Sequence, residues 1–354
     1  MITMEDLLAL LVRKGGSDLH ISVHSPPRIR IDGVLVPVEV EILNAEDTRR
    51  LATSVLTSDQ IAKLDRELEL DCSFELEGQG RFRANVFFQR GAVAMALRLV
   101  PHEMATFEQL GLPRDVCEKL CSLRSGLVLV TGATGSGKST SLASMIDHLN
   151  RTRQSHIVTI EDPVEFTHES QGCLVTQREI GGDTQNFGKA LKSVLRQDPD
   201  IVLVGELRDL ETIEAALTLA ETGHLTFGTL HTSDCVQTIN RIIDVFPSHQ
   251  QQQIRTVLSF SLEGVFCQQL LPAASGRGRV LVAEVMLATP AIRALIREGK
   301  GHQIYSQIQT GARMGMVTMA ASLANLVRSG HVRMEDAEGS LQDPSEFRTR
   351  LKVA

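Results

Sequence analysis

The sequence of 354 residues contains no tryptophan, one tyrosine and no long apolar run, and each shortage narrows what the chain can be. No apolar stretch approaches the ~18 residues of a transmembrane helix, so we expect no membrane span. The first residues are acidic, whereas a secretory signal peptide begins with basic ones. The six cysteines form no Cys-x-x-Cys pair, which argues against a zinc site of that kind and favours a reducing cytosol.

Basic tracts are missing as well. The formal net charge is −7, and there is no run of Lys and Arg such as nucleic-acid translocases use to follow phosphates. We therefore expect no nucleic-acid partner. The length of 354 residues favours two domains, and 42% apolar with 22% charged residues is typical of a globular protein with large cores.

The most informative feature that is present is a nonapeptide of the form G-x-x-x-x-G-K-[ST]. It consists of Gly132, Ala133, Thr134, Gly135, Ser136, Gly137, Lys138, Ser139 and Thr140. The apolar run 127–130 before it predicts a buried strand, and residues 139–150 predict a helix. A glycine-rich turn without a ligand is the alternative, but strand, loop and helix together predict a phosphate-binding loop for a nucleoside triphosphate.

Residues of this loop and of two strand ends carry the expected chemistry. Lys138 can reach the β- and γ-phosphates, and the Ser139 hydroxyl can bind Mg²⁺. Glu161 and Glu206 end predicted strands over 156–161 and 201–204, where an acid commonly handles Mg²⁺ and the attacking water.

The two acids are not equivalent in the sequence. Gly205 stands where many related sites have Asp, so we expect Glu206 to hold the attacking water, the metal through a water, or both. A helix cap is the alternative for Glu206. For Glu161 the alternative is an ordinary turn with Asp162-Pro163.

Two histidines, His224 and His231, flank the predicted strand 225–230. No third and fourth ligand lie at the sequence spacing of a zinc site, so we do not expect these histidines to bind zinc. They have either a structural role or a role at the triphosphate. A histidine at a strand end can hydrogen-bond a phosphate or a catalytic acid and report the nucleotide state. We favour this second role for both.

The pattern of strands and helices changes near residue 100. Before it, alternation predicts a small α+β domain with strands over 18–23, 27–38, 72–76, 81–89 and 92–99 and helices over 45–56 and 58–68. After it, strands over 127–131, 156–161, 201–204, 225–230 and 280–286 alternate with helices over 185–196 and 210–221. Such alternation predicts a parallel or mostly parallel sheet. Helices are predicted from there on, over 248–270, 290–298, 301–310 and 318–329.

Residues 132–140, 160–165, 198–209 and 222–232 together resemble the Walker A, Asp box, Walker B and His box of the secretion ATPase superfamily of type II and type IV systems. The stretches 17–20, 107–113, 177–179 and 195–200 extend the resemblance almost end to end. Residues 291–298 resemble the signature helix of the ATPases that retract type IV pili, although Ala294 replaces the family's Asn. Extension and type II ATPases typically carry a further N-terminal domain and a four-cysteine zinc motif, which this chain lacks.

The resemblance implies an α/β protein with an N-terminal PAS-like α+β domain at 1–100, a linker at 101–113, a RecA-like P-loop ATPase core at 114–290 and a helical C-terminal region at 291–354. It implies a cytoplasmic homohexamer at the inner membrane, which hydrolyses ATP with Mg²⁺ and couples this hydrolysis to domain motion. The motor would drive pilus retraction and twitching motility through an inner-membrane platform protein, without zinc. An accessory retraction ATPase or another secretion-system ATPase is the alternative.

Family analogy also places arginines of the last N-terminal strands near the γ-phosphate. Arg81 and Arg83 share one face of a strand by period two, and Arg98 lies on the next strand. The planar guanidinium pairs well with phosphate oxygens. The alternative for these arginines is an exposed polar edge of the sheet.

Two rival functions remain for the whole chain. One is a nucleic-acid motor, and the other is a nucleotide-binding switch without turnover.

Overall fold

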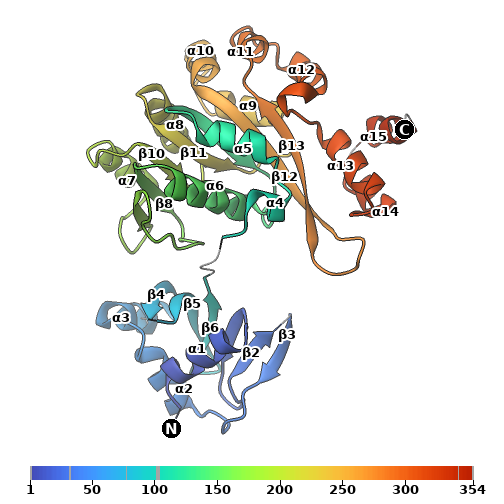
Figure 1. The fold of residues 1–354 in the computed structure, drawn as a ribbon. Helices are drawn as coiled ribbons and strands as arrows, with labels where there is room; N and C mark the ends of the chain where they lie inside the picture. Colours follow the sequence, from blue (N-terminus) through green and yellow to red (C-terminus); the bar gives the residue numbers. More distant parts are fainter. Residues whose placement is uncertain (1, 32, 77, 101–103, 342, 353–354) are drawn as a thin grey trace. The chain divides into compact units, whose positions relative to one another are not determined.

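The computed structural model describes the chain except residues 1, 32, 77, 101–103, 342 and 353–354 (Figure 1). The chain forms two compact units: Met1–His102 with Glu165–Thr167, and Glu103–Val164 with His168–Ala354. The predicted linker 101–113 starts on residues outside the described ones. Its later part contains the short helix α4 (Phe107–Leu110), and α5 (Arg114–Cys121) follows.

The N-terminal unit is built on a six-stranded antiparallel sheet in the order β3-β2-β1-β6-β5-β4. Its strands are β1 (Asp18–Ile21), β2 (Arg28–Ile31), β3 (Val34–Pro37), β4 (Glu69–Leu76), β5 (Gly80–Gln89) and β6 (Ala92–Leu99). Three helices, α1 (Met4–Arg13), α2 (Ala45–Thr53) and α3 (Ser58–Glu67), begin at capping boxes led by Thr3, Asn44 and Thr57. Helix α1 was not predicted from the sequence, although Thr3 and Asp6 form its capping box.

The C-terminal unit contains a seven-stranded sheet in the order β13-β12-β7-β11-β10-β8-β9. Its strands are β7 (Gly126–Thr131), β8 (His156–Glu161), β9 (Leu174–Glu179), β10 (Ile201–Val204), β11 (Leu225–Leu230), β12 (Leu262–Pro272) and β13 (Arg279–Leu287). All neighbouring pairs are parallel except β12 and β13. Every residue of β7, β10 and β11 is buried, as expected for central parallel strands with both faces covered.

The helices of this unit follow the strands. They are α6 (Lys138–Thr152), α7 (Phe187–Val194), α8 (Leu210–Glu221), α9 (Cys235–Asp244) and α10 (Gln251–Ser261). The fold class predicted from the sequence, an α+β unit followed by an α/β unit with a mostly parallel sheet, is confirmed.

The predicted helix over 248–270 is partly wrong. Helix α10 ends at Ser261, and β12 takes the remaining residues between β7 and β13. Packing decides this, because Val265, Phe266 and Cys267 are fully buried in the core of the sheet. Gly264 fits the strand, where a Cβ would lie 2.8 Å from the Leu120 side chain. An apolar run of this length has no period that separates helix from strand.

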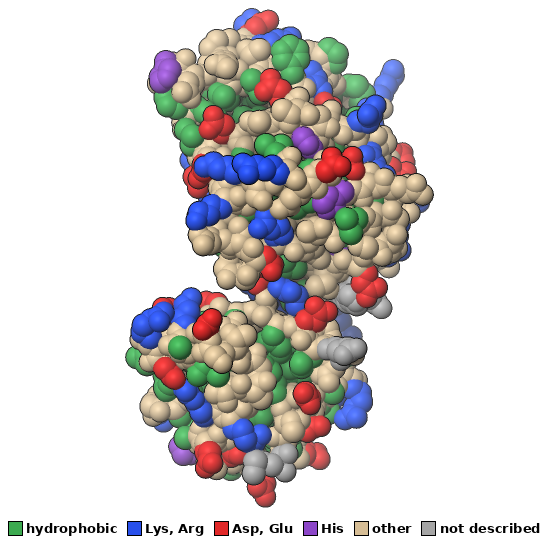
Figure 2. Space-filling model, turned by 90° about the vertical axis from the view of Figure 1, so that its left-hand side faces the viewer, with side chains coloured by type: hydrophobic (Ala, Val, Ile, Leu, Met, Phe, Trp, Pro, Cys, Tyr) green, Lys and Arg blue, Asp and Glu red, His purple; other side chains and the backbone are tan. Residues whose placement is uncertain are grey.

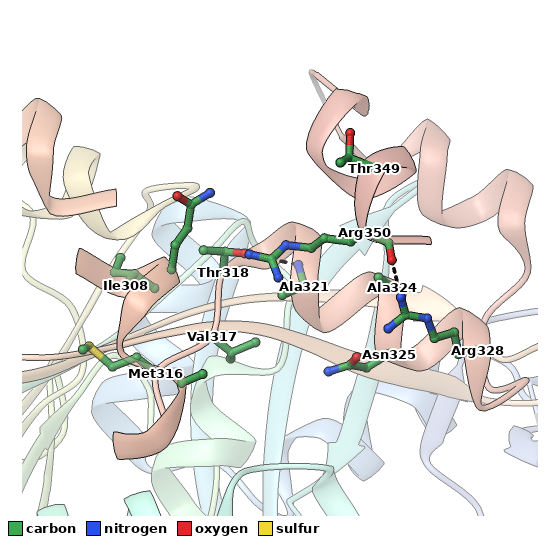
Figure 3. Close-up of a pocket in the computed structure, with 12 residues that line it drawn as sticks. Ile308, Met316, Val317, Thr318, Ala321, Ala324, Asn325, Arg328, Thr349 and Arg350 are labelled. Carbon is green, nitrogen blue, oxygen red and sulfur yellow. Dashed lines mark hydrogen bonds between the residues drawn. The ribbon is translucent and has the colours of Figure 1, made fainter. Parts of the chain in front are cut away.

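The C-terminal region is helical, with α11 (Pro290–Arg297), α12 (Ile304–Thr310), α13 (Met319–Arg328), α14 (Met334–Gly339) and α15 (Ser345–Lys352). Phe347 buries α15 in a small apolar cluster, and Glu346 accepts a hydrogen bond from Tyr305. A hollow of about 440 Å³ opens among α12, α13 and α15, with Arg328 and Arg350 among its lining residues (Figure 3). Its described lining includes no residue of the phosphate loop. None of the described helices is long and apolar enough to cross a membrane.

Two phenylalanines provide a test of the core. Phe227 on β11 is 0% exposed, whereas Phe260 at the end of α10 is 67% exposed. Phe227→Ala should lower the free energy of unfolding by about 3–5 kcal/mol, because it leaves a cavity in the sheet core. Phe260→Ala should cost less than about 1 kcal/mol, mainly its contact with the Arg297 guanidinium 5.5 Å above the ring. Urea unfolding of both variants measures the difference, and equal losses would contradict the assignment of this core.

Candidate functional site

The phosphate loop lies between β7 and α6, at the carboxyl edge of the sheet. Gly137 immediately precedes α6 with φ +90°, a conformation that favours glycine. Gly132 has φ +143°, and a Cβ there would lie 2.3 Å from the Gln268 carbonyl oxygen. The loop therefore packs directly against β12, and its two outer glycines are required by space and by backbone conformation.

Lys138, the first residue of α6, folds over this loop. Its Nζ donates hydrogen bonds to the carbonyls of Gly132 at 2.8 Å and Ala133 at 3.1 Å. Within the loop, the buried Ser136 hydroxyl has no hydrogen-bond partner among the described residues. A buried polar group of this kind calls for a partner, and a phosphate oxygen would supply one. The loop thus fits a phosphate by its shape, its charge and this polar atom.

Glu206 follows β10 and is held by two other side chains. Arg208 approaches both carboxylate oxygens, with Nε 2.7 Å from Oε1 and a terminal nitrogen 2.7 Å from Oε2. His231 Nε2 lies 3.2 Å from Oε1. The hydrogen bond from Arg208 lowers the pKa of Glu206 against the opposing effect of partial burial, and the charges of His231 and Lys138 add to this lowering. Lys138, Glu206 and His231 therefore share one electrostatic environment.

Glu161 lies at the end of β8, beside β10. Its Oε1 accepts hydrogen bonds from Thr159 at 2.6 Å and from Gln177 at 3.3 Å. Gly205 donates its N–H to the Ile160 carbonyl, and a Cβ at Gly205 would lie 3.1 Å from that oxygen and 3.3 Å from the Glu161 Cα. Glycine at 205 thus lets the two acid-bearing strand ends lie close together.

The oxygens of Ser139 and Glu206 are of the kind that Mg²⁺ binds. Ser139 follows Lys138 in the first turn of α6, and Glu206 carries a carboxylate next to the same loop. These hard donors fit a magnesium ion. A thiophilic metal would require sulfur or imidazole ligands instead.

The second histidine lies elsewhere. His224 precedes β11, and Leu225 pairs with Gly126, whereas the loop starts after Thr131 at the other end of β7. His224 Nδ1 is 3.0 Å from the Leu219 carbonyl and 3.2 Å from the Thr222 hydroxyl. The fold therefore places His231 beside Glu206 and His224 at the opposite edge of the sheet.

The three N-terminal arginines lie on one face of their sheet. Phe82 and Ala84 point into the core, so Arg81 and Arg83 occupy the other face of β5. Arg98 is directly opposite Arg83 on β6 and therefore shares that face. The three side chains form one basic face of the N-terminal unit.

Each arginine of this face also has a local partner. Arg81 donates to the Ser73 hydroxyl at 2.7 Å, and Arg83 lies 3.4 Å from Glu165, a residue of the same unit. Arg98 forms a 2.8 Å ion pair with the buried Asp18. This last contact gives Arg98 a structural role in addition to the predicted one.

Three residues near the loop were not assigned from the sequence. Arg208 comes two positions after Glu206, and this spacing in an extended segment was the available signal. Gln268 on β12 exchanges hydrogen bonds with Ser141 of α6, and Arg279 on β13 lies 3.4 Å from the Gly135 carbonyl. No sequence pattern links these last two to the loop, because β12 and β13 join it only through the sheet.

Charges of both signs are interspersed over the face shown in Figure 2. Arginine and lysine side chains alternate there with aspartate and glutamate.

Replacement of Arg208 tests the arrangement around Glu206. In Arg208→Gln the pKa of Glu206 should rise, because the hydrogen bond and charge that lower it are lost. A group with a depressed folded pKa contributes stability above its unfolded pKa and loses that stability as pH falls, so this contribution should shrink in the variant. Carbon NMR of labelled Glu carboxyls measures the shift. Arg196→Gln, at an exposed arginine before β10, is the control, and an unchanged Glu206 in Arg208→Gln would contradict the ion pair.

The chain is similar to known proteins over almost its whole length. A family model described as "Type II/IV secretion system protein" matches residues 2–338. Two Pseudomonas aeruginosa proteins are similar over nearly the whole chain. The type IV pilus retraction ATPase PilT is 48% identical, over 97% of this chain and 99% of its own length. The type IV pilus ATPase PilU is 41% identical, over 99% of this chain and 91% of its own length.

A solved structure agrees with this comparison. The crystal structure of the pilus retraction motor PilT with bound ADP superimposes with a TM-score of 0.92, covering 99% of this chain and 100% of that one. The family predicted from the motifs is thereby confirmed. The chain belongs to the type II/IV secretion system protein family.

Proposed function

We propose that this protein is an ATP-hydrolysing motor that powers the retraction of type IV pili. The observation that carries the proposal is the cluster of Lys138, Glu206 and His231 at the phosphate loop, in a chain that is 48% identical to a pilus retraction ATPase over 97% of its length. The loop supplies nucleotide binding, and the strand-end acid supplies hydrolysis.

Phosphates are held by the backbone N–H groups of the loop and by Lys138, which exchanges its two loop carbonyls for phosphate oxygens. Glu206 orients the attacking water and accepts its proton. Arg208 and His231 fix the position of this carboxylate, and a proton moves to Glu206 more easily once the Arg208 contact loosens. Glu161 assists from the neighbouring strand end.

A magnesium ion would be held by the Ser139 hydroxyl and, through a water, by Glu206. When bound, it would neutralise charge on the phosphates. The other groups act by position and charge: Lys138 fixes the phosphate oxygens, and His231 senses changes at the acid.

The remaining parts of the proposal concern assembly. The protein acts as a homohexamer at the inner membrane, where a platform protein receives the motion. Arg81, Arg83 and Arg98 complete the γ-phosphate site in this ring, with Arg83 the strongest candidate because Arg98 is already paired with the buried Asp18. His224, which lies at the other edge of its own sheet, then acts at the moving interface.

An accessory retraction ATPase is the second candidate. PilU is 41% identical over 99% of this chain, which makes it nearly as similar as PilT. The two candidates share the nucleotide chemistry and differ in whether the motor can retract pili alone.

Two substitutions separate binding from hydrolysis. Lys138→Ala should abolish nucleotide binding, because the loop loses its only lysine cation. Glu206→Gln should retain ATP binding and lose turnover by on the order of 10²–10⁴-fold, the usual contribution of a general base. Binding of a fluorescent ATP analogue and steady-state phosphate release measure the two effects. Near wild-type turnover in Glu206→Gln would transfer the base role to Glu161.

Deletion of the gene tests the cellular role. Cells without a main retraction motor should carry many more surface pili and should not twitch, since pili still extend but are not withdrawn. The wild-type gene should restore both properties, and a Glu206→Gln copy should restore neither. Normal twitching in the deletion strain would support the accessory role instead.

A further inference from the structure

Three metal-binding side chains meet inside the C-terminal unit, outside the nucleotide chemistry described above. Cys235 is the first residue of α9, Cys267 lies on β12, and Glu284 lies opposite Cys267 on β13. The two cysteines are 0% exposed and Glu284 is 2% exposed. Their ligand atoms all lie within 4.8 Å of one another.

The spacing of the two sulfurs suits a tetrahedral ion. Cys235 Sγ and Cys267 Sγ are 3.7 Å apart. Two thiolates bound to zinc at about 2.3 Å in tetrahedral geometry are separated by about 3.8 Å. The thiols therefore need almost no movement relative to one another to accept such an ion.

Hydrogen bonds already orient these groups. The Thr131 hydroxyl donates to Cys267 Sγ at 2.9 Å. Glu284 accepts the N–H of Cys235 at 2.9 Å on one oxygen and the N–H of Met319 at 3.3 Å on the other. Such outer contacts hold the ligands of a metal site in place.

We propose that Cys235, Cys267 and Glu284 form a binding site for one thiophilic divalent cation, Zn²⁺. Binding releases the two thiol protons, and the two positive charges of the ion balance the two thiolates, while the Glu284 carboxylate is a third, negatively charged ligand. Zinc suits this mixed sulfur and oxygen set, whereas Mg²⁺ does not. Spacing in the sequence concealed the site, because the cysteines are 32 residues apart and form no Cys-x-x-Cys pair.

The cluster lies close to the phosphate loop, because the Thr131 hydroxyl contacts Cys267. Thr131 immediately precedes the phosphate loop, and Cys235 begins the helix after His231. An ion here joins α9, β12 and β13 next to the phosphate loop and stabilises that part of the fold.

Metal content tests the site independently of ATP turnover. The full chain is expressed with added zinc, treated with EDTA while folded, desalted and measured by plasma mass spectrometry. We expect about one zinc per chain in the wild type, since the buried ion exchanges slowly. Cys235→Ser and Cys267→Ser should each retain less than a tenth of that amount. Cys173→Ser, at a buried cysteine outside the cluster, should keep it.

A second measurement covers variants that fold poorly. Wild-type protein loaded with Co²⁺ during expression should show intense thiolate-to-cobalt absorption in the near ultraviolet, which two thiolates and a tetrahedral ion produce. Wild-type protein with less than about a tenth of a metal ion per chain and no such band would overturn the proposal. Unchanged metal content in both cysteine variants would also overturn the proposal. So would the finding that the Cys235 and Cys267 thiols of the zinc-treated wild type still titrate as free thiols.

Discussion

The parallel register of the sheet in the C-terminal unit is the constraint on which its chemistry depends. β7, β8, β10 and β11 run in the same direction, so the phosphate loop, Glu161, Glu206 and His231 all follow strand ends at one edge. The strands β7, β10 and β11 are buried over their whole length, so a shift of register would disturb the core as well as separate these side chains. The same packing therefore holds both the fold and the geometry of the candidate site.

Electrostatics then distinguishes the side chains that share this edge. Glu206 faces Arg208, His231 and Lys138, and its carboxylate is favoured by all three positive or ionisable partners. Glu161 is instead held by the hydroxyl of Thr159 and the amide of Gln177. Two acids at neighbouring strand ends consequently have different surroundings, which supports different roles for them.

Short motifs made much of this predictable. The phosphate loop is recognisable from its own residues. The predicted strands at 156–161, 201–204 and 225–230 coincide with β8, β10 and β11, because a compact apolar run is a local signal. Contacts between distant segments were not predictable. Arg279 reaches the loop across 144 residues, and Cys235 meets Cys267 because α9 packs against β12. The strand β12 was itself taken for helix, since burial on both faces removes the alternation that identifies a strand.

Gly205 limits which side chain fits at the end of β10. Its missing side chain lets β10 approach the Ile160 carbonyl, where any Cβ would lie only 3.1 Å from the oxygen. An Asp at this position, which would create the paired acids of many related ATPases, needs the Ile160 carbonyl to give way by a few tenths of an ångström. The distance between these two strand ends is therefore tied to the size of the side chain at position 205.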